Sequence, residues 1–383
     1  MAYKILRCWS LGLAVWCVPG LVMAQKTQLL KSSDYTLQLS ERNTGLKSPW
    51  GMAFLPDGRL LVTQKSGSIA VLSADGRRIE HTITGLPRVA AQGQGGLLDV
   101  ALDPDFSRTP WLYWSYAEPG EDGLSGTSVA RAKLSSGRLQ STEIIYRQIP
   151  KVEGAGHFGS RLVFGRDKSL FITLGDRQKF TPAQDMQQSI GKVVRIQRDG
   201  RIPTDNPKWK TAGARPEIYS LGHRNSQGAA LHPDTGMLWL SEHGPQGGDE
   251  INRVQAGKNY GWPTASYGCN YGDPISDECR LGGGKHSPKF VEPLSVWGPR
   301  SIAPSGMLFY TGTEFPKWRN HVLLASLAGT ALWRIQYRGD KEVQRERLLG
   351  ELGERIRDIE QGPDGALYLI TDSGKLLRLD SLP

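Results

Sequence analysis

Repeated pairs of short strands around Asp-containing turns predict an all-β fold: a six-bladed β-propeller of four-stranded antiparallel blades, with the ring closed by the N-terminal strand. Two further observations favour this fold. The 383 residues include 46 glycines and 11 tryptophans, which indicates a turn-rich protein with aromatic packing. A third short strand also follows most of the pairs, so each unit holds successive antiparallel strands. A pair of β-sandwiches would not explain six similar units.

Five segments show the strand–turn–strand pattern directly, because apolar residues alternate on both sides of a turn. They are WGMAFLPDGRLLVTQ (50–64), LLDVALDPDFSRTPWLYWSY (97–116), SRLVFGRDKSLFITLGD (160–176), QGAALHPDTGMLWLSEHG (227–244) and IRDIEQGPDGALYLITDSGKLLRL (356–379). Their turn aspartates are Asp57, Asp105, Asp167, Asp234 and Asp364. The gap from Asp234 to Asp364 is about twice its neighbours, so a further unit is expected inside it. The segment SGMLFYTGTEFPKWRNHVLLASLAGTALWRIQY (305–337) fits that place with a rebuilt turn.

A third strand is expected in each unit, and a terminal strand is expected to close the ring. The third strands begin near Gly67, Ser128, Gly191, Glu250, Thr330 and Lys375. The segment YTLQL at Tyr35 is expected to pair with the last blade. Long Gly- and Pro-rich connections such as 260–300 separate the blades, and loops of this length in a compact domain are usually functional. Residues 25–383 are thus expected to form one domain.

Residues 1–24 are typical of a signal peptide. Lys4 and Arg7 give a positive start, residues 11–18 form an apolar centre, and small residues precede a cleavage point near Ala24. The alternative is a membrane anchor, which needs about 20 apolar residues. This run is shorter, so we expect export with cleavage near Ala24 and no stable membrane insertion.

Export would leave two cysteines in the mature chain, because Cys8 and Cys17 lie in the signal peptide. Cys269 and Cys279 are separated by the turn-rich NYGDPISDE. In an oxidising compartment, the simplest state of such a pair is one disulfide that closes a loop. A zinc site would need more ligands at close spacing.

The charge is positive but dispersed. The formal net charge is +9, and loss of the two basic residues of the signal peptide would leave +7. The basic residues are scattered along the chain rather than clustered. A nucleic-acid-binding face is therefore not expected, whereas attraction for anionic ligands fits the composition.

Three polar clusters lie on inter-blade loops or at the start of innermost strands, where propellers usually bind ligands. They are GQGG with Gln94, GAGHFGSRL with His157, and SLGHRNSQG with His223, Arg224 and Asn225. Each cluster alone has a structural alternative. A single histidine is more often a satisfied structural residue than a catalyst, and a Gly-rich run need mean no more than a tight turn.

One pairing strengthens the functional interpretation. His157 enters the third blade and Asp176 ends its next strand, so both are expected at one end of that blade. A carboxylate beside an imidazole fixes its tautomer and supports its cation, as a general base requires. The alternative role of Asp176 is to cap the turn after the strand.

Four further side chains could bind an oxidised or anionic ligand. Arg224 and Asn225 suit the polarisation of a carbonyl or quinone oxygen. In RIRD, Arg355 and Arg357 lie on the same side of an extended strand, because side chains repeat every second residue. Two arginines in a channel need anions between them, which an anionic ligand with several carboxylates would supply.

Six motifs together resemble the soluble quinoprotein glucose/aldose sugar dehydrogenases, and most closely the aldose sugar dehydrogenase branch. The motifs are GQGGLLDVALDPDF, HFGSRLVFG, LGHRNSQGAALHPDTG, SEHGPQGGDEIN, GKNYGWP and RIRDIEQGPDG. They occur in the family's order over nearly the whole mature chain. The resemblance implies a six-bladed propeller that binds pyrroloquinoline quinone (PQQ) and Ca²⁺.

The resemblance implies metal-binding positions in two motifs. The backbone carbonyls of Gly244 and Pro245, in the EHGP turn, would hold the Ca²⁺ that clamps the quinone. Glu250 and Tyr260, the latter in NYGWP, match a further Ca²⁺ position of the aldose dehydrogenases.

The resemblance also implies roles around the quinone. His157 would take the proton from the anomeric hydroxyl of an aldose, the hydride would pass to PQQ, and a lactone would leave. Gln94 would contact sugar and cofactor, and Tyr271, inside the disulfide loop, would line the substrate mouth. The quinone oxygens would be bound by Arg224 and Asn225, and the cofactor's carboxylates by Arg355 and Arg357.

Two positions depart from the glucose dehydrogenases. Those enzymes have an Asp before the catalytic His, where this chain has Gly156, so a sugar-hydroxyl partner is missing and strict glucose specificity is not implied. They also have a Lys at a cofactor contact in the fifth blade, where SLAGT places Ala328. Backbone at Ser326, Leu327 and Ala328 would substitute for that contact.

The leading hypothesis is therefore a periplasmic PQQ- and Ca²⁺-dependent aldose sugar dehydrogenase that passes electrons to an unidentified acceptor. One alternative is a calcium-dependent lactonase-type propeller, a hydrolase that needs carboxylate ligands converging on the channel and shows no need for Arg355 and Arg357. The other is a non-enzymatic sugar-binding propeller, which leaves the pairing of His157 and Asp176 unexplained.

Overall fold

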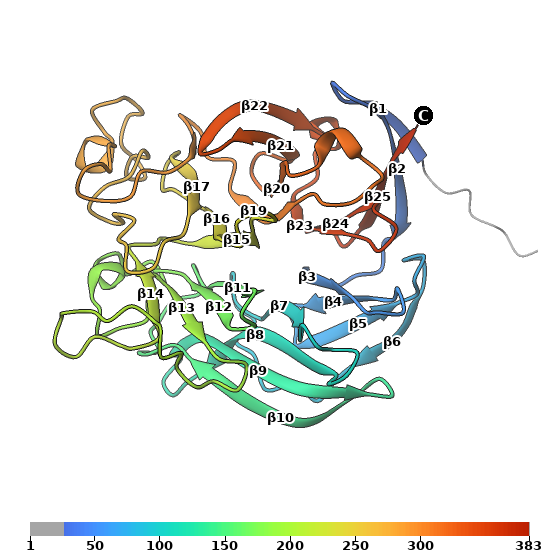
Figure 1. The fold of residues 1–383 in the computed structure, drawn as a ribbon, viewed down its shortest axis with the longest axis horizontal. Coiled ribbons are helices and arrows are strands. Elements are labelled where there is room, and N and C mark those ends of the chain that lie inside the picture. The colour runs from blue at the N-terminus through green and yellow to red at the C-terminus, as the bar shows by residue number, and fades with distance from the viewer. Residues whose placement is uncertain (1–26, 383) are drawn as a thin grey trace, which may run out of the picture.

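Six antiparallel sheets stand around one axis and form a closed ring (Figure 1). The structure, a computed structural model, describes residues 27–382. Apart from four short 3-10 helices, the regular elements of this part of the chain are strands. The predicted all-β, six-bladed propeller is confirmed. The predicted signal peptide, residues 1–24, lies outside the described residues.

Each of the first five blades is a four-stranded sheet of consecutive strands. The first blade contains β3 (Pro49–Phe54), β4 (Leu60–Gln64), β5 (Ser68–Leu72) and β6 (Ile79–Ile83). The second contains β7 (Leu97–Leu102), β8 (Trp111–Pro119), β9 (Ser125–Ser135) and β10 (Arg138–Arg147). The third contains β11 (Gly159–Phe164), β12 (Leu170–Leu174), β13 (Lys192–Ile196) and β14 (Ile218–Leu221). The fourth blade contains β15 (Ser226–Leu231), β16 (Leu238–Glu242), β17 (Asp249–Arg253) and β18 (Ser295–Trp297). The fifth contains β19 (Pro304–Phe309), β20 (Val322–Ser326), β21 (Ala331–Arg338) and β22 (Lys341–Leu348). The unit expected inside the long Asp234–Asp364 gap is thus the fifth blade.

The sixth blade joins the two ends of the described chain. It contains β23 (Ile356–Gln361), β24 (Leu367–Thr371), β25 (Leu376–Leu382), β2 (Thr36–Asn43) and β1 (Thr27–Lys31). The strand β2 pairs with β25, with Leu39 opposite Leu379, so the predicted closure by the N-terminal strand is confirmed. The fifth strand, β1, was not predicted, because most of its side chains are exposed and the sequence shows no buried face there.

The turns between first and second strands form for a local chemical reason. The Asp57 carboxylate Oδ1 accepts a hydrogen bond from Arg59 N at 3.1 Å, and the same contact two residues ahead forms at Asp167 and Asp364. An Asp side chain that binds backbone in this way mimics part of a turn. These three aspartates therefore help to turn the chain back at the end of the first strand in the first, third and sixth blades.

The first strand of each blade lies nearest the axis, and each contacts the first strands of its neighbours (Figure 1). Every first strand also shifts its register near its start. Such a bulge bends the strand and re-aims its side chains. We call the end of the ring at which the first strands begin the mouth.

The hydrophobic core lies between neighbouring blades. Six large clusters fill the six inter-blade spaces, one for each pair of neighbours. Between the fifth and sixth blades, for example, the rings of Phe315 and Trp318 stack with centroids 4.6 Å apart. Full burial of a side chain such as Phe or Leu contributes about 1.5–3 kcal/mol. This packing fixes the blades around the mouth.

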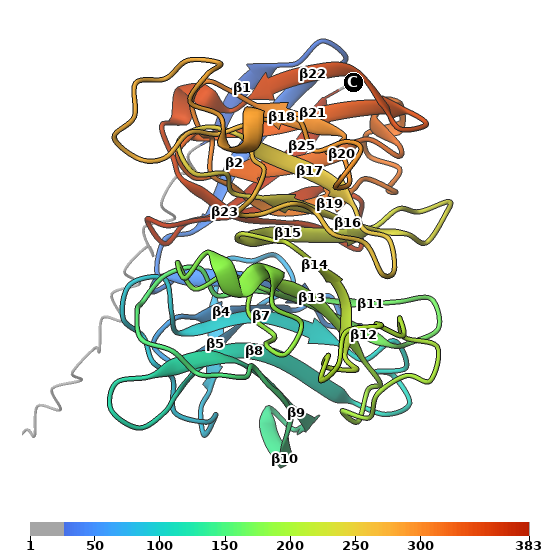
Figure 2. The same cartoon turned by 90° about the vertical axis from the view of Figure 1, so that its left-hand side faces the viewer.

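A long connection between β17 and β18, residues 254–294, extends from one end of the fourth blade (Figure 2, orange). The predicted disulfide between Cys269 and Cys279 lies in it and is confirmed, with a Cα–Cα distance of 5.1 Å. The 3-10 helices also lie in connections: η1 (Thr181–Gln184), η2 (Leu281–Gly283), η3 (Pro316–Trp318) and η4 (Gly350–Leu352). Within residues 27–382, none of these helices has the length and apolarity needed to cross a membrane.

Candidate active site

A histidine and a carboxylate meet at the mouth of the third blade. His157 lies just before β11 and Asp176 just after β12, and these strands are antiparallel. His157 Nδ1 lies 2.6 Å from Asp176 Oδ1, and both side chains are buried. Because an ionised carboxylate only accepts, Nδ1 carries the proton and Nε2 is the basic nitrogen. Nε2 has no hydrogen-bond partner within residues 27–382 and stays accessible.

The Asp176 carboxylate has two further donors that the sequence analysis missed. Trp262 Nε1 donates to Oδ2 at 2.8 Å, and Gln178 N donates to Oδ1 at 2.9 Å. Hydrogen bonds to both oxygens fix the orientation of the carboxylate, which in turn fixes the imidazole of His157. Trp262 belongs to the NYGWP motif and reaches the third blade from the 254–294 connection.

The backbone around this pair is strained. His157 has φ 50°, and Arg177, Gln178 and Phe180 have φ 53°, 58° and 62°. Non-glycine residues in this region are sparsely populated and cluster at functional sites. The buried Arg177 guanidinium holds the loop by donating from Nε to Gly156 O at 2.9 Å.

Gln94, which the resemblance assigns to contacts with sugar and cofactor, lies beside His157. Its side-chain Oε1 accepts from His157 N at 2.8 Å, and its backbone N donates to Ala155 O at 2.7 Å. Its side chain is exposed at the mouth. Gln94 therefore positions the histidine's backbone and also faces the space where a substrate would lie.

Arg224 and Asn225 lie next to the same space, and each carries an unused donor. Arg224 Nη1 donates to Gly244 O at 2.6 Å, and Asn225 Oδ1 accepts from Gly159 N at 3.2 Å. Arg224 Nε and Asn225 Nδ2 are buried without a partner in the described part of the chain. An unpaired buried donor costs free energy, so these two atoms point to a missing acceptor.

Aromatic rings flank Arg224. Its guanidinium lies 5.1 Å from the ring of Trp262 and 5.9 Å from that of Tyr271. Tyr271 is 72% exposed and lies inside the disulfide loop. The loop thus places an exposed aromatic side chain near Arg224, and the role of Tyr271 toward a substrate stays a prediction.

The segment SEHGPQGGDEIN forms a turn held by its own aspartate. Asp249 accepts hydrogen bonds from Gly244 N at 2.9 Å and from Ile302 N at 2.6 Å. Burial raises the pKa of Asp249. Gly244 and Pro245 are buried at this turn, and their carbonyl oxygens are of the ligand type that Ca²⁺ prefers.

His243, in the same turn, is a neutral imidazole. Burial and, to a lesser extent, Arg224 lower the pKa of His243 to about 3. Its Nε2 lies 2.7 Å from Pro304 O, so Nε2 carries the proton and donates it to the carbonyl. His243 is thus a structural residue that ties the fourth blade to the fifth.

Glu250 and Tyr260 line one small enclosed cavity together with Glu242 and His286. Burial and the neighbouring Glu242 carboxylate raise the pKa of Glu250 well above its usual range. A cation between the two carboxylates would remove this repulsion. The Tyr260 hydroxyl is already engaged at both its proton and its oxygen, because it donates to Arg253 O at 2.6 Å and accepts from Gln255 N at 2.8 Å. The backbone of Tyr260 is therefore the more available ligand.

Arg355 and Arg357 contact one carboxylate at the mouth of the sixth blade. Their Nε atoms lie 2.8 and 2.9 Å from the oxygens of Asp372. Asp372 therefore supplies part of the anion that the sequence analysis assigned to a ligand. Lys65 lies near the same group: burial and Arg357 lower its pKa. Three cations around one carboxylate leave a net positive site.

The fifth-blade segment that would substitute for a missing lysine is largely engaged in its own blade. The Ser326 hydroxyl donates to Ala331 O at 2.8 Å, and Leu327 N donates to Ala303 O at 3.0 Å. Ala328 is exposed. The hydroxyl of Ser326 and the amide of Leu327 are therefore not free, which leaves Ala328 as the open position.

A model of the glucose/sorbosone dehydrogenase family matches residues 46–378. The chain belongs to this family. An aldose sugar dehydrogenase, YliI, of Escherichia coli (strain K12) is 42% identical over 355 residues, covering 91% of this chain and 94% of that protein. A crystal structure of a glucose dehydrogenase has a TM-score of 0.84 at 44% identity, covering 90% of this chain and 99% of that one. The PQQ-bound aldose sugar dehydrogenase of Streptomyces coelicolor has a TM-score of 0.71 at 28% identity, with coverages of 93% and 98%.

The order of the strands in a blade is a sequence signal that predicts further contacts at the mouth. In the third blade, the start of the first strand meets the end of the second, which pairs His157 with Asp176. The same relation in the sixth blade pairs Arg357 with Asp372. Lys65 carries the same signal, because it directly follows β4, the second strand of the first blade. Trp262 and Gln178 carry no such signal, because loops bring them to the mouth.

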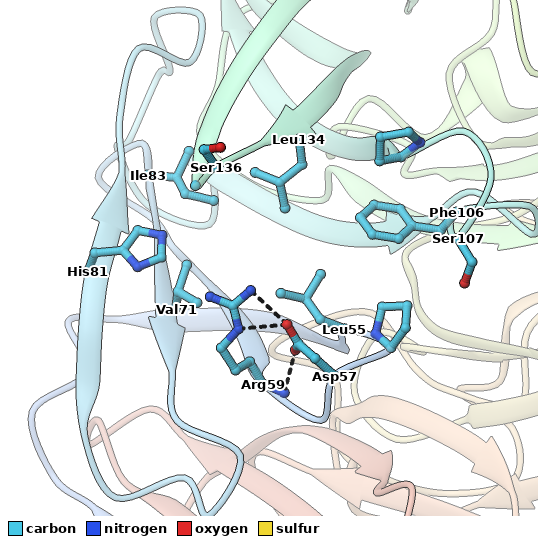
Figure 3. A pocket seen from close by; sticks show the side chains of 13 residues that line it. Leu55, Asp57, Arg59, Val71, His81, Ile83, Phe106, Ser107, Leu134 and Ser136 are labelled. Carbon is cyan, nitrogen blue, oxygen red and sulfur yellow. Dashed lines mark hydrogen bonds and ion pairs between the residues drawn. The ribbon is translucent and has the colours of Figure 1, made fainter.

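A separate cavity of about 650 Å³ lies between the first and second blades. Its lining combines apolar side chains with polar ones, among them Asp57, Arg59 and His81 (Figure 3). None of the predicted site residues lines it. The candidate site at the mouth is therefore distinct from this cavity.

Proposed function

We propose that the protein is a periplasmic PQQ- and Ca²⁺-dependent aldose sugar dehydrogenase that oxidises the anomeric carbon of aldoses to a lactone. The observation that carries this proposal is the buried contact of His157 Nδ1 with Asp176, which leaves Nε2 accessible at the mouth. The names of the relatives, an aldose sugar dehydrogenase and a glucose dehydrogenase among them, support the reaction class.

The residues at the mouth fit an anionic quinone with carbonyl oxygens. Arg224 Nε and Asn225 Nδ2 are buried donors without a partner in the described residues, and quinone oxygens are acceptors. Arg355, Arg357 and Lys65 leave excess positive charge around Asp372, which suits carboxylates. PQQ would supply the acceptor for the hydride, and its presence in a solved relative supports this choice.

Calcium fits two positions. The Gly244 and Pro245 carbonyls would hold one ion near Arg224, where a cation supplies Lewis acidity toward a quinone oxygen. Glu250, repelled by Glu242, would hold another with the Tyr260 backbone. No group of three or more His, Cys, Asp or Glu side chains in residues 27–382 is placed to hold a metal, so backbone carbonyls would carry much of the coordination.

The protein's own residues account for the proton. His157 Nε2 accepts the proton of the anomeric hydroxyl as the hydride leaves the same carbon, and the C–O bond becomes a lactone carbonyl. Asp176 stabilises the imidazolium that forms, and Trp262 keeps Asp176 in place. Gln94 and Tyr271 bind the sugar at the mouth. An unidentified acceptor then removes the two electrons.

Two alternatives have less support. A calcium-dependent hydrolase needs side-chain carboxylates that converge on the metal, and the described residues contain no such group. A non-enzymatic sugar-binding propeller gives no reason for a strained histidine hydrogen-bonded to a buried carboxylate.

The test is reconstitution. The mature protein is purified without cofactor, PQQ and CaCl₂ are added, and dye reduction by a panel of aldoses is followed with lactone formation. We expect dye reduction that needs both additions. Hydrolysis of lactones without dye reduction, or no reaction with any aldose, would contradict the proposal. Export is tested separately by N-terminal sequencing of the mature protein, which should begin near Gln25.

A further inference from the structure

Gln178 places a side-chain amide against the glycine that precedes the histidine. A Cβ atom at Gly156 would lie 2.6 Å from Gln178 Oε1 and 2.8 Å from Cδ. Real Cβ atoms essentially never come so close, so a Cβ at 156 would displace the amide, which can shift because it ends a flexible, exposed side chain. The amide of Gln178 therefore occupies the space that a side chain at 156 would fill, beside His157.

The backbone holds Gln178 in this position. Its N–H donates to Asp176 Oδ1, the same oxygen that accepts the hydrogen bond from His157 Nδ1. Its φ of 58° is a strained value for glutamine. The neighbouring Arg177 guanidinium holds the other side of the loop through Gly156 O. The position of Gln178 is thus coupled directly to the histidine–carboxylate pair.

The side-chain amide itself is unused. Within residues 27–382 neither Oε1 nor Nε2 of Gln178 makes a hydrogen bond, and the side chain is exposed at the mouth. An amide offers one acceptor and two donors, so it can bind a hydroxyl in either sense. It has no charge, so it imposes no preference for charged sugars.

We propose that Gln178 is a specificity-determining residue whose amide hydrogen-bonds the hydroxyl on the carbon next to the anomeric carbon. The inference rests on the proposed function, which places the anomeric hydroxyl at His157 Nε2. The next hydroxyl along the ring is the one closest to that point, and Gln178 supplies a free polar group beside the histidine. The substrate class is therefore aldoses with a hydroxyl at this carbon.

The test compares glucose with 2-deoxyglucose, which lacks that hydroxyl. Gln178→Ala removes the amide, and Gly156→Ala displaces it by adding the Cβ that it would meet. Lys179→Ala is the matched control, because Lys179 is exposed in the same loop and its side chain has no assigned role. PQQ affinity of each variant is measured by absorbance titration, so that loss of cofactor is recognised.

We expect Gln178→Ala to lower kcat/KM for glucose by about 3- to 10-fold, the worth of one neutral hydrogen bond, mainly through KM. The value for 2-deoxyglucose should stay unchanged, and Gly156→Ala should show the same selective loss. Lys179→Ala should match the wild type on both sugars.

Equal losses on the two sugars, or no loss on glucose, would overturn the role of Gln178. These outcomes are distinct from failure of the proposed function. A wild-type protein that binds PQQ and Ca²⁺ but oxidises no aldose would remove the dehydrogenase proposal, and the Gln178 proposal with it. An active wild type with unselective variants would remove only the role of Gln178.

Discussion

Two buried groups of basic side chains and carboxylates lie along strand β11, and they have different roles. His157 lies just before β11, and Arg161 lies within it, further down the channel. His157 meets one carboxylate of its own blade and keeps one nitrogen free. Arg161 instead joins blades: it donates from Nη1 to Asp99 Oδ1 at 3.1 Å and pairs through Nη2 with Asp358 at 2.9 Å.

The two side chains differ in whether a nitrogen atom remains accessible to a ligand. Arg161 also donates from Nε to Gln227 O at 2.7 Å and stacks 4.4 Å from the Trp50 ring. Its contacts reach the first, second, fourth and sixth blades, so it acts as a structural tie. His157 has a strained backbone and an unused nitrogen. The two groups therefore differ in that His157 keeps an accessible nitrogen, whereas Arg161 is enclosed by carboxylates of two other blades.

The largest expected effect is a loss of turnover without a loss of stability, and it is expected at His157. His157→Ala removes the base, and turnover of the reconstituted enzyme should fall by about 10²- to 10⁴-fold. PQQ affinity and Tm should change little, because other residues bind the cofactor and hold the blade. Rate, titration and thermal melting are measured on the same preparation. Near-normal turnover in folded, cofactor-loaded protein would remove the base assignment.

The opposite result is expected at Arg161. Arg161→Met leaves Asp99 and Asp358 buried without their cation, which should lower the free energy of unfolding by about 3–5 kcal/mol. Urea denaturation measures this loss. The turnover of the fraction that stays folded should remain close to that of the wild type. A large loss of turnover at normal stability would contradict the contrast between the two clusters.

The channel carboxylates should make stability depend on pH. Burial is the main cause that raises the pKa of Asp99 to about 6, whereas an unfolded Asp titrates near about 3.9. Because the folded pKa is the higher one, the protonated carboxyl favours the folded state. Stability from this group is present below about pH 4 and is lost as the pH rises through 6.

The variant Asp99→Asn should flatten that dependence. Between pH 4 and 6 the wild type should lose about 1–3 kcal/mol relative to this variant, measured by denaturation across the range. His157→Ala provides the comparison, since it leaves the channel carboxylates intact and should keep the wild-type slope. Parallel curves for the wild type and Asp99→Asn would show that Asp99 does not titrate there.

The smallest effect is expected at Asp176. Asp176→Asn keeps the shape of the side chain but weakens its hold on the imidazole, so turnover should fall by less than the loss expected for His157→Ala. The pH profile of turnover should change as well, because the imidazolium loses its carboxylate. A loss of stability with an unchanged pH profile would instead indicate that Asp176 only caps its turn.

The fold was largely predictable because its signals are local. Alternation marks the strands, and Asp57 and its counterparts mark the turns through contacts two residues away. The pairing of His157 with Asp176 also follows from local signals, since strand order alone brings the two together.

The rest of the site depends on contacts that no local pattern encodes. Trp262 lies in an irregular connection and reaches Asp176 across 86 residues of chain. The partner of Arg161 in the sixth blade, Asp358, is likewise fixed only when the ring closes. The unpaired atoms of Arg224 and Asn225 are visible only once everything around them is placed.

Ring closure has a consequence for the order in which the molecule can be made. Thr36 pairs with Leu382, so β25 completes a sheet begun by β2, more than 300 residues earlier in the chain. During synthesis the first five blades can form while the sixth stays incomplete, and the circle remains an open arc. Asp358, and with it the contact through Arg161, takes its place only once the sixth blade is made. The mouth is therefore closed only after β25 has been synthesised, and before that point the ring has no finished site for a ligand to occupy.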